Sequence, residues 1–231
     1  MKKLILSFLP IFILSSQVFA IAGFGAQLGQ SMFSVDESSP TLSVPGVTLK
    51  NGAYDNAYSL GGYFYIDAIP VVDLEVDFNI QGNKYDINFE NALGVKMAPL
   101  NFAWGSTDVY FTVRKKIIGI GIPFLAKAKL FAGGGYNTHL STPIANEKML
   151  TSLCDDDLAN CDVTSLDKTL ETYMTNKDNY LSSSGFHLQG GLQFKILMLD
   201  SFLFYRQVFA DKVIPDGKGY GSINLRLGMG L

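Results

Sequence analysis

The segment from Val72 to Gln81 alternates apolar and polar residues without an exception. The apolar set is Val72, Leu74, Val76, Phe78 and Ile80. The polar set is Asp73, Glu75, Asp77, Asn79 and Gln81. A helix would scatter these side chains around its circumference, whereas a β-strand places successive side chains on opposite faces. The alternation therefore predicts a strand with one apolar face and one polar, acidic face.

The same period of two recurs along the chain and predicts an all-β fold. Counting segments between connections gives ten strands, at Ala22–Phe33, Tyr58–Ala68, Val71–Gln81, Tyr85–Met97, Leu100–Trp104, Thr107–Ile118, Phe124–Tyr136, Gly185–Ile196, Ser201–Ala210 and Gly219–Leu231. If Tyr85–Trp104 is an elaborated loop, eight strands remain. Either even count fits an antiparallel up-and-down β-barrel of 8–10 strands.

The connections between the predicted strands differ in length at the two ends. Prolines at positions 70, 99 and 123 mark short turns, because proline cannot donate a hydrogen bond within a strand ladder. At the opposite end, two connections are long and polar, residues 34–56 and 137–184. Three shorter connections are expected there, at residues 82–84, 105–107 and 211–218. This asymmetry is typical of transmembrane barrels, which have short periplasmic turns and long extracellular loops.

Residues 1–20 have the features of a secretory signal peptide. Lys2 and Lys3 precede an apolar run, and Val18-Phe19-Ala20 ends it with a small residue at −1 and a valine at −3, which signal peptidase tolerates. An uncleaved anchor helix is the alternative for this segment. Cleavage after Ala20 would leave residues 21–231 as one exported domain.

Alternation alone does not distinguish a membrane barrel from a soluble one, whose apolar face points inward. Strands of about 9–11 residues cross a bilayer at a tilt, which matches the predicted lengths. Aromatic residues near strand ends fit interfacial girdles: Phe64, Tyr85, Trp104, Tyr136, Phe186, Tyr205 and Tyr220. The acids of Val72–Gln81 would then face the interior and need cationic partners, for which the same predicted face offers Lys96, Lys127, Lys129, Lys195 and Arg226.

With these features the chain resembles the family of small bacterial outer-membrane β-barrel proteins. The resemblance covers nearly all of residues 21–231 and includes the strand Gly219–Leu231 that ends the chain. It implies an outer-membrane location, contact with membrane lipid and lipopolysaccharide, and insertion by the barrel insertion machinery. Family members usually end on an aromatic residue that this machinery reads, whereas this chain ends on Leu231.

The most unusual loop segment runs from Cys154 to Asp162. The two cysteines, Cys154 and Cys161, are the only ones in the chain, and in an exported protein they predict a short-loop disulfide. Four acids surround them: Asp155, Asp156, Asp157 and Asp162. Clustered carboxylates could bind a divalent cation, or bridge such ions to lipopolysaccharide. The EF-hand spacing is absent, and a merely solvated acidic loop is the alternative.

No residue pattern indicates a cofactor, and the net charge of −3 without a basic patch argues against nucleic acid. A His-x-Ser pair, His139 and Ser141, resembles that of outer-membrane lipid A deacylases but lacks an acid at matching spacing. His187 follows the long loop, where omptin-type proteases place a rim histidine. We therefore expect a non-enzymatic barrel with a role in envelope structure or surface interaction. The alternatives are a narrow solute channel, a rim-located lipid or peptide hydrolase, and a soluble periplasmic ligand-binding barrel.

Overall fold

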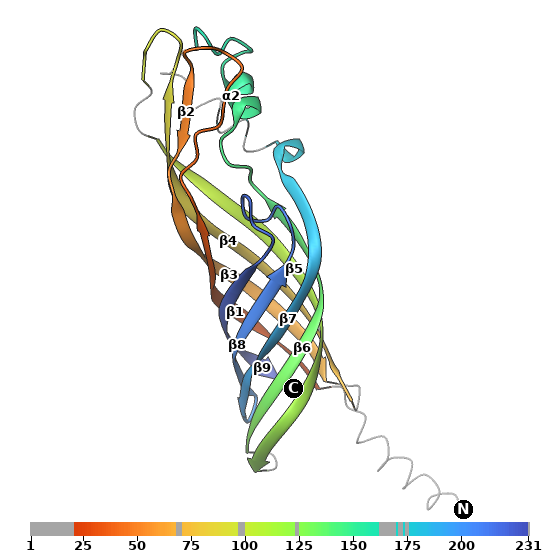
Figure 1. Ribbon diagram of the computed structural model, residues 1–231. Coiled ribbons are helices and arrows are strands. Elements are labelled where there is room, and N and C mark those ends of the chain that lie inside the picture. Colours follow the sequence, from red (N-terminus) through yellow and green to blue (C-terminus); the bar gives the residue numbers. More distant parts are fainter. Residues whose placement is uncertain are drawn as a thin grey trace, which may run out of the picture.

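The computed structural model of the protein describes residues 21–67, 71–96, 100–122, 125–161, 170, 173 and 176–230 (Figure 1). The predicted signal peptide, residues 1–20, lies outside this range. No helix within these ranges is long and apolar enough to cross a membrane.

Eight long antiparallel strands form a closed barrel. They are β1 (Ile21–Val35), β3 (Tyr54–Asp67), β4 (Asp73–Glu90), β5 (Leu100–Ile122), β6 (Ala126–Ser141), β7 (Leu181–Ile196), β8 (Leu199–Phe209) and β9 (Tyr220–Gly230). Each pairs with its neighbour in sequence, and β9 pairs with β1, so the sheet has no free edge around the barrel wall. Closure is what a membrane requires, because every backbone N–H and C=O in hydrocarbon must be paired within the protein.

The strands are staggered by ten residues around the barrel. Following the paired residues from Ala22 once around the wall leads back to β1 at Met32. Such a stagger tilts the strands about 35–45° from the barrel axis. With eight strands, the interior is just wide enough to be filled by side chains.

The predicted antiparallel up-and-down barrel of 8–10 strands is confirmed, and its wall has eight strands, the lower of the two counts. The expected turn at residues 82–84 lies in the middle of β4, and the expected turn at residues 105–107 lies within β5. These two strands continue well past the rest of the barrel at the end that carries the long connections, which we call the loop end (Figure 1). The opposite end, with its short connections, is the turn end.

The apolar face of β4 changes sides along the strand. From Leu74 to Ile80 the apolar side chains point outward and are exposed, while the acids between them are buried inside. Beyond Gly82 the inward positions become apolar, at Tyr85, Ile87 and Phe89. Hydrocarbon outside the barrel favours the first arrangement, and water outside favours the second. The sequence change at Gly82 therefore marks the edge of the membrane-facing wall rather than a turn.

An apolar belt surrounds the part of the barrel below this boundary. Its members are exposed on several strands and include Phe24, Leu28, Leu60, Phe64, Val76, Phe78, Phe111, Val113, Leu188, Leu192, Leu203, Leu225 and Leu227. A soluble barrel would bury these side chains inside, so the alternative of a soluble periplasmic barrel is wrong. The aromatic girdle is only partly as predicted. Phe64, Tyr136, Phe186 and Tyr205 face outward, whereas Tyr85, Trp104 and Tyr220 are buried in the interior because they occupy inward positions of their strands.

A cap covers the barrel at the loop end. We define the loop-end cap as β2 (Thr48–Asn51), the parts of β4 and β5 beyond Gly82 and Gly105, and residues 142–161. Strand β2 pairs with the end of β4. A short helix, α2 (Glu147–Leu153), begins at Asn146, whose side chain accepts a hydrogen bond from the backbone N–H of Met149. A single 3-10 turn, η1 (Lys177–Asn179), precedes β7.

Candidate functional site

The barrel interior is the most distinctive chemical feature of the described molecule. The chain contains three arginines, Arg114, Arg206 and Arg226, and all three are buried there. They come from β5, β8 and β9, at positions where the alternation of each strand turns a side chain inward. The acids that meet them, Asp73, Glu75 and Asp77, stand on the inward face of β4.

The three arginines and three acids compensate one another. Arg114 bonds Asp73 at 2.9 Å and lies 3.4 Å from Glu75. Arg226 is 2.8 Å from Glu75 and 2.5 Å from Asp77, and Arg206 also pairs with Asp77. Equal numbers of opposite charges offset the cost of burying each one. The prediction that Arg226 meets these acids is confirmed, but the proposed lysines do not reach them, because Lys96 lies at the loop end and the others lie at the turn end.

Aromatic rings fill the space around the guanidinium groups. Arg206 stacks on Tyr110 at 3.9 Å, and Arg226 lies 4.5 Å from the Phe204 ring centre. Arg114 is 4.9 Å from both Phe131 and Phe202. Guanidinium is planar and weakly hydrated, so it suits such stacked, buried positions better than the ammonium group of lysine. This difference explains why the arginines occupy the interior and the lysines do not.

Nearer the loop end, a second polar layer contains His139. Its Nδ1 lies 2.7 Å from an Asp108 oxygen, and its Nε2 lies 2.9 Å from the Asn137 side-chain oxygen. Asp108 also accepts a hydrogen bond from the Ser106 hydroxyl at 2.5 Å. The Ser141 hydroxyl instead donates to the Lys212 carbonyl, 3.4 Å away. Both ring nitrogens of His139 thus have partners other than the Ser141 hydroxyl, and the pair lacks the hydrogen bond of a nucleophile and its base.

His187 belongs to the same buried layer. Its Nε2 lies 2.9 Å from the Thr112 hydroxyl, and its ring packs edge-on against Tyr110 at 5.2 Å. The side chain is 1% exposed and lies well inside the barrel, not at its rim. Strand β7 begins at Leu181 rather than at the predicted Gly185, so His187 lies further from the end of its strand than predicted.

Above this layer the cap closes the loop end with apolar packing. Trp104 is 1% exposed and contacts the rings of Phe33 and Tyr54, at centroid distances of 5.3 and 6.2 Å. Tyr54 in turn stacks on Tyr85 at 5.3 Å. The Tyr85 hydroxyl accepts a hydrogen bond from the backbone N–H of Ala145, 2.9 Å away. Residues 142–146 are thereby tied to the end of β4.

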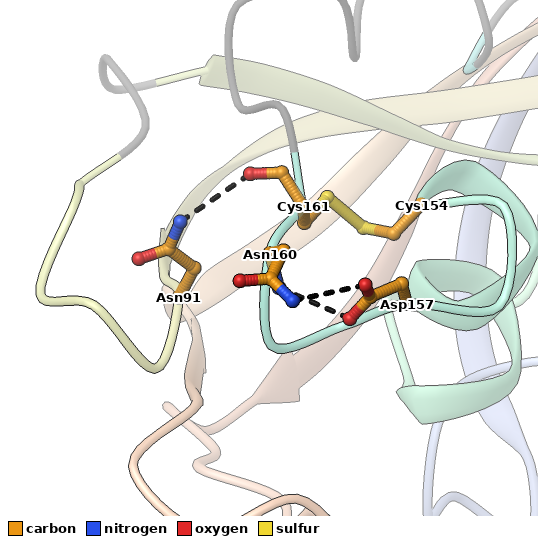
Figure 2. Close-up of a disulfide and its surroundings, with 5 residues drawn as sticks. All are labelled: Asn91, Cys154, Asp157, Asn160 and Cys161. Atoms are coloured by element: carbon orange, nitrogen blue, oxygen red, sulfur yellow. Dashed lines mark hydrogen bonds between the residues drawn. A yellow bond between two sulfur atoms is a disulfide. The ribbon is translucent and has the colours of Figure 1, made fainter.

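A disulfide joins Cys154, at the end of α2, to Cys161. Both cysteines are buried, and the carbonyl of Cys161 accepts a hydrogen bond from the Asn91 side chain, which lies just past the end of β4 (Figure 2). The predicted disulfide is thus present and lies between the α2 segment and the β4–β5 connection.

The acids around this disulfide point to solvent. Asp155 and Asp156 are exposed, and each has a positive φ, of 49° and 65°. Asp157 accepts hydrogen bonds from the side chain and backbone N–H groups of Asn160, which lower the pKa of its carboxyl (Figure 2). Asp162 lies outside the described residues. Within the described ranges no three His, Cys, Asp or Glu side chains are grouped to hold a metal ion. The cation site therefore stays a prediction.

No protein-family model and no curated protein matches this sequence. Solved structures that it resembles include the outer membrane protein OprG from Pseudomonas aeruginosa, with a TM-score of 0.47, 10% identity and coverage of 92% of this chain and 96% of that chain. Neisserial surface protein A gives 0.44 and 12%, covering 91% and 96%. Ail of Yersinia pestis, in complex with the heparin analogue sucrose octasulfate, gives 0.42 and 10%, covering 92% and 99%. At these identities the likeness concerns the fold alone.

The closed wall, the polar interior and the exposed apolar belt all indicate the same kind of barrel. Closed, up-and-down barrels with an apolar exterior and a polar interior are the form in which β-proteins cross the bacterial outer membrane. The chain therefore folds as a closed eight-stranded antiparallel β-barrel with the apolar belt and polar interior of an outer-membrane barrel.

Proposed function

We propose that the protein is a non-enzymatic barrel that anchors its loop-end cap at the cell surface, where the cap serves envelope structure or surface interaction. The observation that carries this proposal is the filled interior. The largest side chains with less than 2% exposure include Arg114, Arg206, Arg226, Tyr65 and Phe202, all inside the barrel. Because side chains fill the interior of the barrel, we assign the interaction surface to the loop-end cap.

The interior also argues against the enzymatic alternative. A rim hydrolase needs an accessible nucleophile within hydrogen-bond reach of its base. His139 and His187 are each no more than 2% exposed, and their polar neighbours are Asp108, Asn137 and Thr112. These contacts fit a packing role for both histidines.

The narrow channel is the second candidate, and it is favoured only by the polar character of the interior. It requires the pairs between Arg114, Arg206, Arg226 and their acids to open. Conductance in planar lipid bilayers separates the two functions. Our proposal predicts no stable conductance steps from the wild-type barrel; regular, ion-selective steps would establish the channel instead.

The orientation of the barrel is part of the proposal. With a cleaved signal peptide at residues 1–20, the barrel would be inserted from the periplasm, and the regions 34–56 and 137–184 would face outside. The exposed acids of the cap, Asp155 and Asp156, would then meet lipopolysaccharide, with divalent cations between the two negative surfaces. The barrel insertion machinery remains the expected partner in assembly.

Lysine labelling tests this orientation directly. The described lysines fall into two groups: Lys50, Lys84, Lys96, Lys148, Lys177, Lys212 and Lys218 lie at the loop end, and Lys115, Lys116, Lys127, Lys129 and Lys195 lie at the turn end. An amine reagent that cannot cross membranes, applied to intact cells, should label the first group only. Labelling of the turn-end group in intact cells would reverse the proposed orientation.

A further inference from the structure

The hairpin of β5 and β6 extends beyond the rest of the barrel at the turn end (Figure 1). The last pair between β4 and β5 joins Asp73 to Arg114, yet β5 continues to Ile122. Over residues 115–122, β5 pairs with β6 alone among the described strands. Beyond Arg114, β5 thus has no β4 partner among the described residues.

The two faces of the overhang differ in chemistry. On the outer face, Ile118, Ile120 and Ile122 are 62%, 78% and 61% exposed and continue the apolar belt. On the inner face, Gly119 and Gly121 pair with Lys129 and Lys127 of β6. A Cβ at Gly121 would lie 3.0 Å from Lys127 Cγ, so glycine lets the lysine stem lie close to the hairpin backbone.

An open groove of about 1010 Å³ lies between this overhang and the β7–β8 turn. Its apolar lining comes from Ile120, Ile122, Leu125, Leu197 and Met198. Backbone hydrogen bonds fix the far wall in place: the Leu197 N–H donates to the Leu125 carbonyl at 2.9 Å, and the Gly230 N–H donates to the Met198 carbonyl at 2.9 Å. The groove is thus part of the ordered barrel end.

Four lysines also line this groove: Lys116, Lys127, Lys129 and Lys195. The nearby acids are already engaged. Asp67 pairs with Lys129 at 3.1 Å, Asp73 pairs with Arg114, and Asp200 accepts hydrogen bonds from Tyr65 and Gln193.

Within the described part of the chain, Lys116, Lys127 and Lys195 therefore have no carboxylate within ion-pair distance. The groove therefore combines an apolar wall next to the membrane belt with more lysines than nearby carboxylates, because Asp200 and Asp67 act on Lys195 while Lys116 and Lys127 have no described ion pair. This combination matches an amphiphile that has an anionic head.

We infer that the groove binds one anionic phospholipid of the membrane leaflet at the turn end. The phosphate lies among the ammonium groups of Lys116, Lys127 and Lys195, and an acyl chain lies along Ile120 and Ile122. Free inorganic phosphate offers the same charge but cannot use the apolar wall. A zwitterionic lipid offers the chain but gains less from the lysines.

Native mass spectrometry of the detergent-purified barrel tests this inference, with phosphatidylglycerol and phosphatidylcholine added separately. The test variant is K116Q/K127Q, because both side chains lie outside every described ion pair. The matched control is K84Q/K218Q, which removes two exposed lysines at the loop end. Heat-induced mobility shifts of each variant establish that the barrel is folded.

The wild type and the control should retain one phosphatidylglycerol about tenfold more tightly than phosphatidylcholine, and K116Q/K127Q should lose most of this preference. Millimolar inorganic phosphate should leave the lipid bound. Equal retention of both lipids, an unchanged preference in folded K116Q/K127Q, or displacement by inorganic phosphate would each overturn the inference. Weak binding of several lipid molecules, with no single preferred one, would also overturn the inference.

Discussion

Asp77 and Arg206 form an ion pair across the full width of the barrel. Their strands, β4 and β8, are four strands apart in either direction around the wall, which makes them diametrically opposite. Both side chains are essentially unexposed, and Arg226 adds a second cation to the same carboxylate at 2.5 Å. The pair thus ties opposite sides of the wall together and closes the interior at this level.

Replacing Asp77 with Asn should therefore destabilise the barrel strongly. Two buried guanidinium groups would lose a charged partner, and breaking a buried pair in this way costs about 3–5 kcal/mol. Urea unfolding in lipid vesicles measures the effect, with Asp86→Asn, exposed on the outer face of the same strand, as the control. The double variant D77N/R206Q should cost less than the two single changes together. A loss for D77N no larger than that of the control would remove the structural role of this pair.

Because the membrane-facing wall ends near Gly82, an arginine on the outward face of β4 should be costly before this boundary and nearly neutral beyond it. Val76→Arg places a charge in the membrane belt and should cost about 2–4 kcal/mol of unfolding free energy. Asn88→Arg lies on the same outward face of β4, beyond the boundary, where its side chain is exposed. It should change the unfolding free energy by less than about 0.5 kcal/mol. Similar costs at both positions would show that the membrane wall does not end near Gly82.

The disulfide between Cys154 and Cys161 should stabilise the cap without affecting the barrel wall. A cross-link of this kind contributes about 2–4 kcal/mol by restricting the opened state. In the variant C154S/C161S, hydrogen exchange should become faster at the Cys154-position amide, which bonds the Leu150 carbonyl, and stay unchanged at Val76 in the wall. In the native protein both thiols should react with alkylating reagents only after reduction. Free thiols without reduction would contradict the structure.

One contact of the cap should respond to acid. The Ser43 hydroxyl and the Ser43 backbone N–H both donate to the Glu147 carboxylate, and these bonds lower the pKa of Glu147 below its ordinary 4.5. A carboxyl with a lowered pKa stabilises the fold above its unfolded pKa and loses that contribution as pH falls through its folded pKa. The protection of the Ser43 amide, meaning its exchange rate relative to the intrinsic rate at the same pH, should therefore decrease below about pH 4.5. Glu147→Gln should flatten this pH dependence, and an unchanged wild-type profile between pH 6 and pH 3, roughly the range of the transition, would contradict the contact.

Much of the barrel wall could be predicted from the sequence, because the alternation over Val72–Gln81 reports which face of a strand meets hydrocarbon. The same rule misplaced the turns at residues 82–84 and 105–107. A change in which face is apolar looks like the end of one strand and the start of another. In β4 the apolar face changes because the strand passes out of the membrane. The surroundings of the strand change there, while its backbone continues in the same direction.

The cationic partners of the buried acids were harder to predict. Asp73, Glu75 and Asp77 clearly needed cations, but pairing depends on the stagger of strands that lie far apart in sequence. Arg206 reaches Asp77 only because closure brings β8 opposite β4. One signal was available: the chain has only three arginines, and each stands at an inward position of an alternating segment. A weaker sequence signal was present for helix α2: Asn146 is a good N-cap residue, and Met149, Leu150 and Leu153 have the spacing of one helix face.

The chain closes into a barrel with its apolar face toward lipid. The most direct test is to compare unheated and boiled samples of outer-membrane fractions by gel electrophoresis in denaturing detergent. A closed barrel resists the detergent until heated, so the unheated protein should migrate as a separate, compact band in the membrane fraction. Recovery of the protein in the soluble periplasm, with one band regardless of heating, would contradict the account.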